Sequence, residues 1–324
     1  MLGFVIQRLL QAAAIMLAMS VIVFTGVYAI GNPIDVLIPP DADQKLRAEV
    51  IVRYGLDLPL WRQYLVFLGN ALQGDFGRSF LYALPTLQLI LSRLPATLEL
   101  ALAATLAATL IGVPLGMYAG YRPDSIPARL IMGLSVLGFS LPTFWVGLIL
   151  ILTFAVHLGW LPAGGRGATV EVFGVGWSFL TRDGLMHLLL PALNLSLFKL
   201  AMLTRLARAG TREAMLSDFV KFARAQGLSE PLVLFRHVLK TIAIPLVTVF
   251  GLELGTTLAF AVVTETIFSW PGMGKLIIDS ITALDRPVMV AYLILITFLF
   301  VVINLVVDLV YAVLDPRLRQ GRTA

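Results

Sequence analysis

The sequence predicts an all-α membrane protein with six transmembrane helices. Of its 324 residues, 59% are hydrophobic and only 13% are charged, and the mean hydropathy is +0.91. Soluble domains contain about 45–50% apolar and about 25% charged residues, so this composition disfavours a water-soluble enzyme. The chain has no cysteine, which excludes disulfide scaffolds, thiolate metal sites, iron–sulfur clusters and cysteine nucleophiles.

Six stretches are apolar and long enough to cross a bilayer, which requires about 20 residues each. In chain order they are approximately 9–30, 96–119, 130–158, 187–204, 241–268 and 288–314. The first has too long an apolar run for a signal peptide, and no A-x-A cleavage pattern follows it, so we expect a retained helix. The fourth is irregular because it is short and contains Pro191, Asn194 and Lys199.

The distribution of basic residues predicts that both termini are cytoplasmic. With the amino terminus inside, the inner segments hold 14 of the 24 basic residues and carry a net charge of +9. The outer segments are neutral, and their short loops hold only four basic residues. This asymmetry follows the positive-inside rule. No series of aromatic residues accompanies the basic ones, as base stacking would require, so the charge does not indicate nucleic-acid binding.

The inner segment 205–240 is too long for a simple connection, and its periodicity predicts an amphipathic helix of about three turns. Four apolar residues recur in it at i, i+4, i+7 and i+8: Met215, Phe219, Phe222 and Ala223. Gly227 is a C-terminal stop signal, and Ser229 with Pro231 predicts the start of a second helix. Periodicity alone leaves open whether this pair lies among lipid headgroups or docks into a partner protein.

Residues 218–229, DFVKFARAQGLS, resemble the coupling-loop motif of ABC importer permeases. The A-R-A-x-G-L-S form is similar to that of dipeptide, oligopeptide and nickel uptake systems. Lys221, Phe222 and Ala223 stand where the wider family has Glu-Ala-Ala, and Gly227 stands at the motif glycine. The other residues that the resemblance assigns to ATPase coupling are Asp218, Phe219, Arg224, Ala225 and Leu228.

The resemblance extends over essentially the whole chain, with one further departure. The wider family has a proline thirteen residues after the motif glycine, where this chain has Lys240, with its proline at Pro245. The other matching stretches are 2–10, 54–61, 74–79, 93–97, 140–145, 158–162, 265–274 and 308–318. The resemblance implies a type I ABC importer permease fold in three parts. These are an N-terminal transmembrane helix with a periplasmic helical segment (1–95), the permease core (96–314) and a cytoplasmic tail (315–324).

A permease of this kind performs no covalent chemistry. The chain has no G-x-x-x-x-G-K-[S/T] loop, because Gly274-Lys275 lacks both the upstream glycine and the following hydroxyl. Its three histidines are never at metal-ligand spacing. The chain itself is therefore expected to be no enzyme and to bind no metal or cofactor.

The resemblance implies a working assembly in the bacterial inner membrane. Its parts are this chain, a second homologous permease, two ATP-binding subunits that hold ATP and Mg²⁺, and a periplasmic solute-binding protein. The ATP-binding subunits would hold the coupling helix in their surface grooves. Di- and oligopeptides are the expected cargo, with a nickel complex, glutathione or an opine-like compound as alternatives.

A second possible site lies within the fifth span. Glu253 falls inside Gly251-x-x-x-Gly255, a spacing that permits close helix approach. It either lines the translocation path, where it would meet an ammonium group or a metal cation, or bonds to a neighbouring helix. For Glu99 and Glu265, near span ends, solvated or capping roles suffice.

The exterior segment 31–95 is predicted to contain short helices at 45–56 and 59–72. It either caps the outer mouth or contacts the binding protein that delivers the cargo.

Two rival classes of protein fit the sequence less well. An ion-gradient-driven secondary transporter would be expected to show internal repeats, and the two halves of this chain show none. It would also leave the amphipathic inner segment unexplained. An intramembrane enzyme is disfavoured because the chain has no G-x-S-G, paired intramembrane aspartates or H-E-x-x-H.

Overall fold

A computed structural model of the chain describes residues 2–29, 43–53 and 57–314. The predicted tail at 315–324 lies outside the described residues. The chain divides into two compact units, which are treated separately below. The first consists of Met1–Ala96 and Pro271–Val301, and the second of Thr97–Trp270 and Val302–Ala324.

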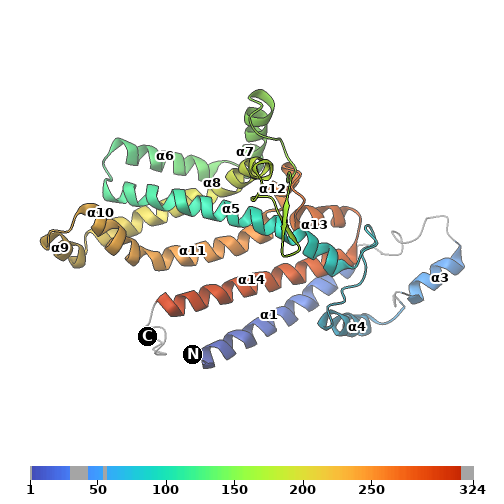
Figure 1. Cartoon of the computed structure of the whole chain (residues 1–324). Helices are drawn as coiled ribbons and strands as arrows, with labels where there is room; N and C mark the ends of the chain where they lie inside the picture. Colours follow the sequence, from blue (N-terminus) through green and yellow to red (C-terminus); the bar gives the residue numbers. More distant parts are fainter. Residues whose placement is uncertain (1, 30–42, 54–56, 315–324) are drawn as a thin grey trace. The chain divides into compact units, whose positions relative to one another are not determined.

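The first unit is helical and packs through aromatic side chains. Phe24 lies 5.4 Å from Tyr64 and 5.5 Å from Phe67, measured between ring centroids. The hydroxyls of Ser20 and Tyr64 are 2.8 Å apart, so a polar contact accompanies this apolar one. The elements of this unit are α1 (Leu2–Ala29), α3 (Gln44–Arg53), α4 (Leu60–Leu72), the start of α5 (Thr86–Tyr121), α13 (Met273–Thr282) and the start of α14 (Arg286–Leu314) (Figure 1).

Helices α3 and α4 are those predicted at 45–56 and 59–72, although residues 54–56 are outside the described part of the chain. Buried Asp285 fixes the segment after α4, because its carboxylate accepts hydrogen bonds from the Ser79 hydroxyl at 2.5 Å and the Leu81 amide at 3.1 Å.

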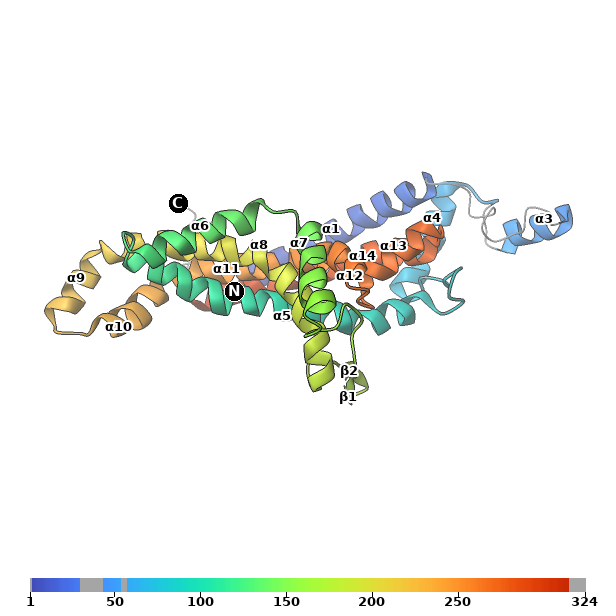
Figure 2. The ribbon, with the colours of Figure 1, turned by 90° about the horizontal axis from the view of Figure 1, so that it is seen from above.

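The second unit is a helical bundle with a short hairpin of helices at one end. Within it α5, α6, α8 and α11 lie side by side, and α9 and α10 lie beyond their ends (Figure 1, Figure 2). Its elements after α5 are α6 (Ile126–Ser140), α7 (Thr143–Leu150), the π-helix η1 (Ile151–His157), β1 (Val170–Val172), β2 (Val175–Trp177), α8 (Arg182–Met215), α9 (Asp218–Ala225), α10 (Glu230–Leu232), the π-helix η2 (Val233–Val238), α11 (Leu239–Phe260), α12 (Val262–Ile267) and the end of α14.

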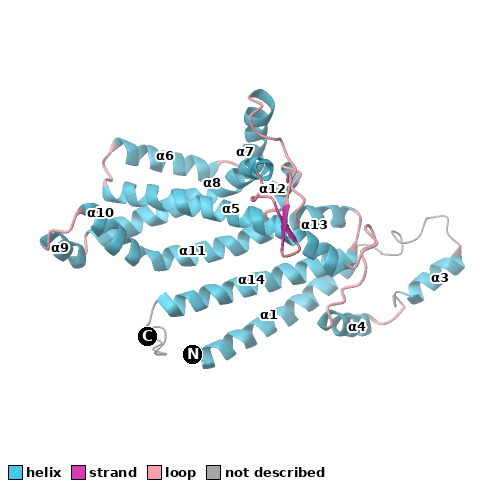
Figure 3. Ribbon diagram, in the orientation of Figure 1, coloured by secondary structure: helices cyan, strands magenta, loops and turns pink. Residues whose placement is uncertain are grey.

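The all-α prediction holds except for one small β-hairpin, which is drawn in magenta in Figure 3. Its antiparallel strands pair Val170 with Trp177 and Val172 with Val175. The two turn residues, Phe173 and Gly174, have φ values of 53° and 75°. Positive φ at both positions is the geometry of the type I′ turns that join two-residue hairpins.

The described helices account for the predicted spans. Five are long and apolar enough to cross a membrane, and a bent pair supplies a sixth if it is counted as one span. These five are Ile6–Gly26, Thr86–Tyr121, Arg182–Met215, Glu230–Leu258 and Arg286–Val307.

The bent pair occupies the predicted third span, where α6 and the α7–η1 segment meet at 106°. The break falls at Leu141-Pro142. Pro142 has no amide hydrogen to continue the helix, and Leu141 before it is extended, with ψ at 135°.

Helices α5 and α8 approach closely along a row of glycines that the span predictions did not single out. Gly112, Gly116 and Gly120 recur every four residues and face the backbone of α8. A Cβ atom added at Gly116 would lie 2.3 Å from the carbonyl oxygen of Thr204, and one at Gly120 would lie 2.6 Å from that of Arg208. The core beside this row includes Ala108, Val113, Met117, Leu203, Ala207, Ile242 and Leu246.

Helix α11 makes a similar close approach to α14 in the same unit. A Cβ atom added at Gly251 would lie 2.0 Å from Cγ2 of Val307. The close helix contact predicted from the Gly251-x-x-x-Gly255 spacing is thus confirmed at its first glycine.

Candidate functional site

The amphipathic helix predicted in the inner segment is α9, and the chain ends it with a specific turn. Gly227 has a φ of +81°, a left-handed conformation that only glycine adopts without strain. Its amide donates to the carbonyl of Arg224 at 2.9 Å, and the amide of Leu228 donates to that of Ala223 at 3.2 Å. This pair of bonds is a Schellman motif, so Gly227 is required by the geometry of the turn.

One face of α9 is packed against the segments on either side of it. Val220 and Ala223 are 0% and 3% exposed. They share a buried cluster with Ala214, Val233 and Val238, and Leu228 packs against the same cluster. Motif residues Ala223 and Leu228 therefore hold α9 on the ends of α8 and η2.

The two phenylalanines lie on an adjacent, exposed face, which corrects the predicted single stripe. Phe219 is 40% exposed and Phe222 is 65% exposed, whereas Ala223 is buried. The stripe prediction omitted Val220, which is three residues before Ala223 and forms the true inner face with it. Ala225 is also exposed, so the predicted coupling residues divide between an inward and an outward face.

Two ion pairs involve the charged residues of α9. Lys221 Nζ contacts Asp218 Oδ1 at 2.8 Å on the exposed side of the helix. Arg224 donates from Nε and Nη2 to the two carboxylate oxygens of Glu230, at 2.8 and 3.1 Å. Such a two-point contact fixes both side chains in one geometry, and here it joins α9 to the start of α10. These hydrogen bonds from Arg224 to Glu230 raise the pKa of the guanidinium above its ordinary value, so it stays charged.

Glu253 pairs with a residue of another span. Its carboxylate Oε2 lies 2.7 Å from Lys199 Nζ, which also donates to the Glu253 carbonyl at 3.3 Å. The Lys199 side chain is 7% exposed and that of Glu253 is 15% exposed. The contact joins α8 to α11. Of the two predicted roles for Glu253, the geometry therefore supports the bond to a neighbouring helix. The sequence analysis treated Lys199 as an irregularity of its span and counted it among the basic residues of the inner segments, whereas the structure buries it against Glu253.

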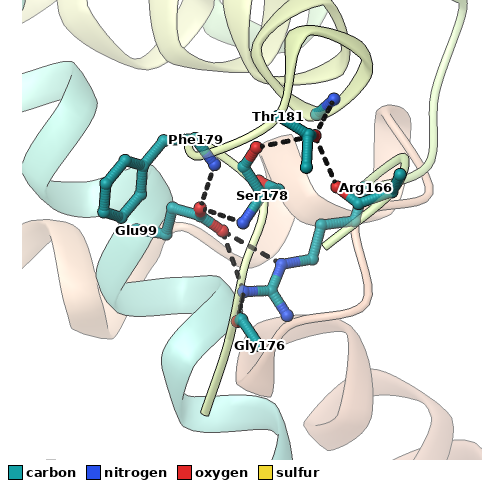
Figure 4. Close-up of polar contacts among 8 residues, drawn as sticks. Glu99, Arg166, Gly176, Ser178, Phe179 and Thr181 are labelled. Carbon is teal, nitrogen blue, oxygen red and sulfur yellow. Dashed lines mark hydrogen bonds and ion pairs between the residues drawn. The ribbon is translucent and has the colours of Figure 1, made fainter. Parts of the chain in front are cut away.

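A second buried carboxylate organises the loop before α8. Figure 4 shows the Glu99 carboxylate between the Arg166 guanidinium and the backbone of residues 178–179. Its Oε1 accepts from the amides of Ser178 and Phe179 at 2.6 and 2.7 Å, and its Oε2 accepts from Arg166 Nε at 3.0 Å. Arg166 in turn donates to the carbonyl of Gly176 in β2, at 2.7 Å.

The solvated roles expected for two glutamates near span ends are wrong. Glu99 is 3% exposed and Glu265 is 0% exposed. Glu265 accepts a hydrogen bond from Thr97 Oγ1 at 2.7 Å, which joins α12 to α5. Buried carboxylates persist only with such partners, and those partners lie 67 or more residues away in sequence, where no local pattern indicates them.

The described residues contain no group of three or more His, Cys, Asp or Glu side chains that could hold a metal ion. Their polar groups instead connect helices to one another and to the hairpin loop. Together with five to six membrane-crossing helices, this arrangement defines a multi-pass membrane protein with a packed amphipathic helix at one end of its bundle.

Comparison with protein families narrows the class to one family. Residues 112–320 match the model described as "Binding-protein-dependent transport system inner membrane component". Residues 1–101 match the model for the N-terminal part of such membrane components. The chain belongs to the family of inner membrane components of binding-protein-dependent transport systems.

Curated relatives align with the chain over nearly their whole length. It is 39% identical to the di/tripeptide transport permease DppB of Pseudomonas aeruginosa, over 99% of this chain and 100% of that protein. It is 39% identical to the oligopeptide permease AppB of Bacillus subtilis, over 98% of this chain and 99% of that protein. It is 37% identical to the glutathione permease GsiC of Escherichia coli, with the same coverage.

A solved chain of the MetNI methionine ABC transporter has the same fold, with a TM-score of 0.52 at 16% identity. The alignment covers 70% of this chain and 97% of that one. The predicted type I ABC importer permease fold is thereby confirmed. The chain is a permease subunit of a binding-protein-dependent ABC importer, a multi-pass inner membrane protein and not itself an enzyme.

Proposed function

We propose that this permease carries di- and oligopeptides across the inner membrane and that α9 couples it to ATP hydrolysis in partner subunits. In the working assembly a second homologous permease completes the pathway, and a periplasmic binding protein delivers the cargo. Two ATP-binding subunits bind ATP and Mg²⁺ and contact α9 from the cytoplasm. The curated relatives that transport di/tripeptides and oligopeptides support this choice of cargo.

The construction of α9 is the observation that carries the coupling role. Its inner face is packed, its C-terminal end is fixed by the Gly227 turn, and Arg224 joins it to the next helix. The phenylalanines Phe219 and Phe222 are nevertheless left on the outside. Exposed aromatic residues on a rigid helix are suited to a hydrophobic groove on a partner, because little conformational entropy is lost on binding.

The orientation that coupling requires has support from the charge asymmetry. If both termini are cytoplasmic, α9 and the basic residues beside it face the ATP-binding subunits, and the β1–β2 hairpin faces the periplasm. The same orientation places the Glu99–Arg166 contact at the outer mouth.

The decisive test compares two phenylalanines of equal exposure in the inner segment. Phe222 in α9 and Phe235 in η2 are each 65% exposed. The assembled importer is reconstituted in proteoliposomes with a Phe222→Ala or a Phe235→Ala permease, and uptake and ATP hydrolysis are measured with peptide-loaded binding protein. We expect Phe222→Ala to lower both rates at least tenfold and Phe235→Ala to change them less than twofold, since about 2 kcal/mol is typical of a buried aromatic anchor.

Equal rates for the Phe222→Ala and wild-type importers would refute the coupling role. Uptake that follows an ion gradient without ATP would refute the importer mechanism itself. The cargo is tested separately, by mass spectrometry of the ligand that co-purifies with the cognate binding protein. A nickel complex, glutathione or an opine-like compound in place of a peptide would overturn the cargo proposal and leave the coupling role intact.

A further inference from the structure

A pocket of 490 Å³ in the second unit lies between α6 and the last turns of α8. Three of its lining residues, Arg205, Arg208 and Arg212, are spaced i, i+3 and i+7, so they share one face of α8. Within the described part of the chain no carboxylate pairs with any of the three. The buried Nε of Arg208 also has no hydrogen-bond partner there. Arg205 lies over the Phe139 ring of α6, with 5.7 Å between its Cζ and the ring centroid. With three arginines and one glutamate, the pocket carries a net positive charge.

The rest of the pocket is mainly apolar. Met132 of α6, Ala209 of α8 and Leu216 directly after α8 line it beside the arginines, and Glu213 is its single acidic residue. Leu130 and Leu134, which flank Met132 on α6, are more than 60% exposed. An occupant that matches this surface has an anionic group next to a hydrocarbon chain.

The depth of the pocket along α8 matches the lipid headgroups. This helix has 34 residues, so it is about 51 Å long, whereas the hydrocarbon core of a bilayer is about 30 Å thick. The apolar part of α8 ends at residue 204, immediately before Arg205. At 1.5 Å per residue, Arg205 and Arg208 lie about 2 and 6 Å beyond that end, within a headgroup layer about 5–8 Å thick. The backbone of Arg212 lies about 12 Å beyond it, but helix side chains tilt toward the N-terminus, so its guanidinium is directed back toward that layer.

We propose that this pocket binds the phosphate of an anionic phospholipid, whose acyl chains lie against α6 and the apolar wall. Arginine forks are matched to phosphate oxygens, and basic pockets between membrane helices select anionic headgroups over zwitterionic ones. The inference requires only that the chain spans a membrane, so it does not depend on the proposed cargo or on coupling through α9.

The test is native mass spectrometry of the full-length chain, purified in detergent and titrated with phosphatidylglycerol or with phosphatidylcholine of the same acyl chains. The double variant Arg208→Gln/Arg212→Gln is compared with Arg236→Gln/Lys240→Gln. The second pair removes the same charge from exposed positions of the same inner segment that do not line the pocket. Circular dichroism verifies that each variant is folded.

We expect the wild-type chain to retain phosphatidylglycerol at least tenfold more strongly than phosphatidylcholine. Loss of each pocket arginine should weaken that binding about fivefold, so the first variant binds about 25-fold less tightly and the control less than twofold. Equal retention of the two lipids, or equal losses in the two variants, would overturn the proposal. Displacement of the lipid by millimolar inorganic phosphate, or by the second permease on assembly, would show that free phosphate or a protein is the natural occupant and would also overturn it.

Discussion

Replacement of Gly116 with alanine should separate α5 from α8 and destabilise the second unit. The added Cβ atom would lie 2.3 Å from the carbonyl oxygen of Thr204 and 2.7 Å from Cβ of Ala207. Ordinary contacts of this kind are 3.4–4 Å long. One helix must therefore move by about 1 Å, because neither obstacle is the flexible end of a side chain.

The expected cost follows from that movement. Overpacking of a well-packed interior costs about 1–3 kcal/mol, and a backbone obstacle places this case near the upper end. Alanine regains at most about 1 kcal/mol over glycine through its helix propensity. The net destabilisation is thus about 2 kcal/mol, which corresponds to a fall of about 4–8 °C in Tm for a unit of about 150–250 residues such as the second.

The assay is the temperature at which the detergent-purified chain loses its monodisperse peak in size-exclusion chromatography. Other glycines provide a graded series, because the same atom would lie 2.6 Å from its nearest neighbour at Gly120, 3.0 Å at Gly112 and more than 4 Å from any at Gly133 of α6. We expect the fall in Tm to follow that order, with Gly133→Ala slightly more stable than the wild type because it gains helix propensity without a clash. A Gly116→Ala protein as stable as Gly133→Ala would refute the steric reasoning.

Three further predictions concern buried charge and orientation. Glu99→Gln leaves the buried Arg166 guanidinium without its counter-charge, so we expect the free energy of unfolding to fall by about 2–3 kcal/mol. The β1–β2 loop should then be cleaved faster by proteases, and unchanged cleavage would contradict this. Lys199→Met should lower the free energy of unfolding by about 3–5 kcal/mol because it leaves the buried Glu253 carboxylate unpaired. The double variant Lys199→Met/Glu253→Gln should regain most of that stability in the same Tm assay. A double variant that is stable but inactive in uptake would instead assign the carboxylate to the translocation path. Because the chain has no cysteine, single cysteines at Lys221 and Phe173 report orientation directly, and a membrane-impermeant maleimide added to intact spheroplasts should label only the second.

The sequence predicted the helices well because membrane spans depend on local composition. Each predicted span has a counterpart, and the break in the third follows from Pro142, whose effect on the preceding residue is also local. The turn after α9 was predictable for the same local reason, because a glycine such as Gly227 commonly ends a helix in the left-handed conformation.

The buried polar contacts could not be predicted in the same way. The pairing of Glu253 with Lys199 joins residues 54 positions apart, and the Glu99 carboxylate meets amides 79 and 80 positions away. Nothing in the local sequence distinguishes such a carboxylate from one that faces solvent. The inner face of α9 was missed for another reason: aromatic residues dominate the hydrophobicity of the helix, yet the smaller Val220 and Ala223 are the ones buried in the cluster with Ala214, Val233 and Val238.

The motif in the proposed coupling segment therefore contains two kinds of residue. Ala223, Arg224, Gly227 and Leu228 build a rigid support, and the exposed residues around Phe222 form the surface that it presents. A force applied to that surface reaches α8 and η2 through packed side chains, which in close-packed protein deform little. The force is transmitted along α8 to the glycine contacts with α5 and to the ion pair with α11. The three helices should therefore move as one rigid body rather than bend separately. Substitutions in the support should accordingly reduce both stability and coupling, whereas those on the outer surface should reduce coupling alone.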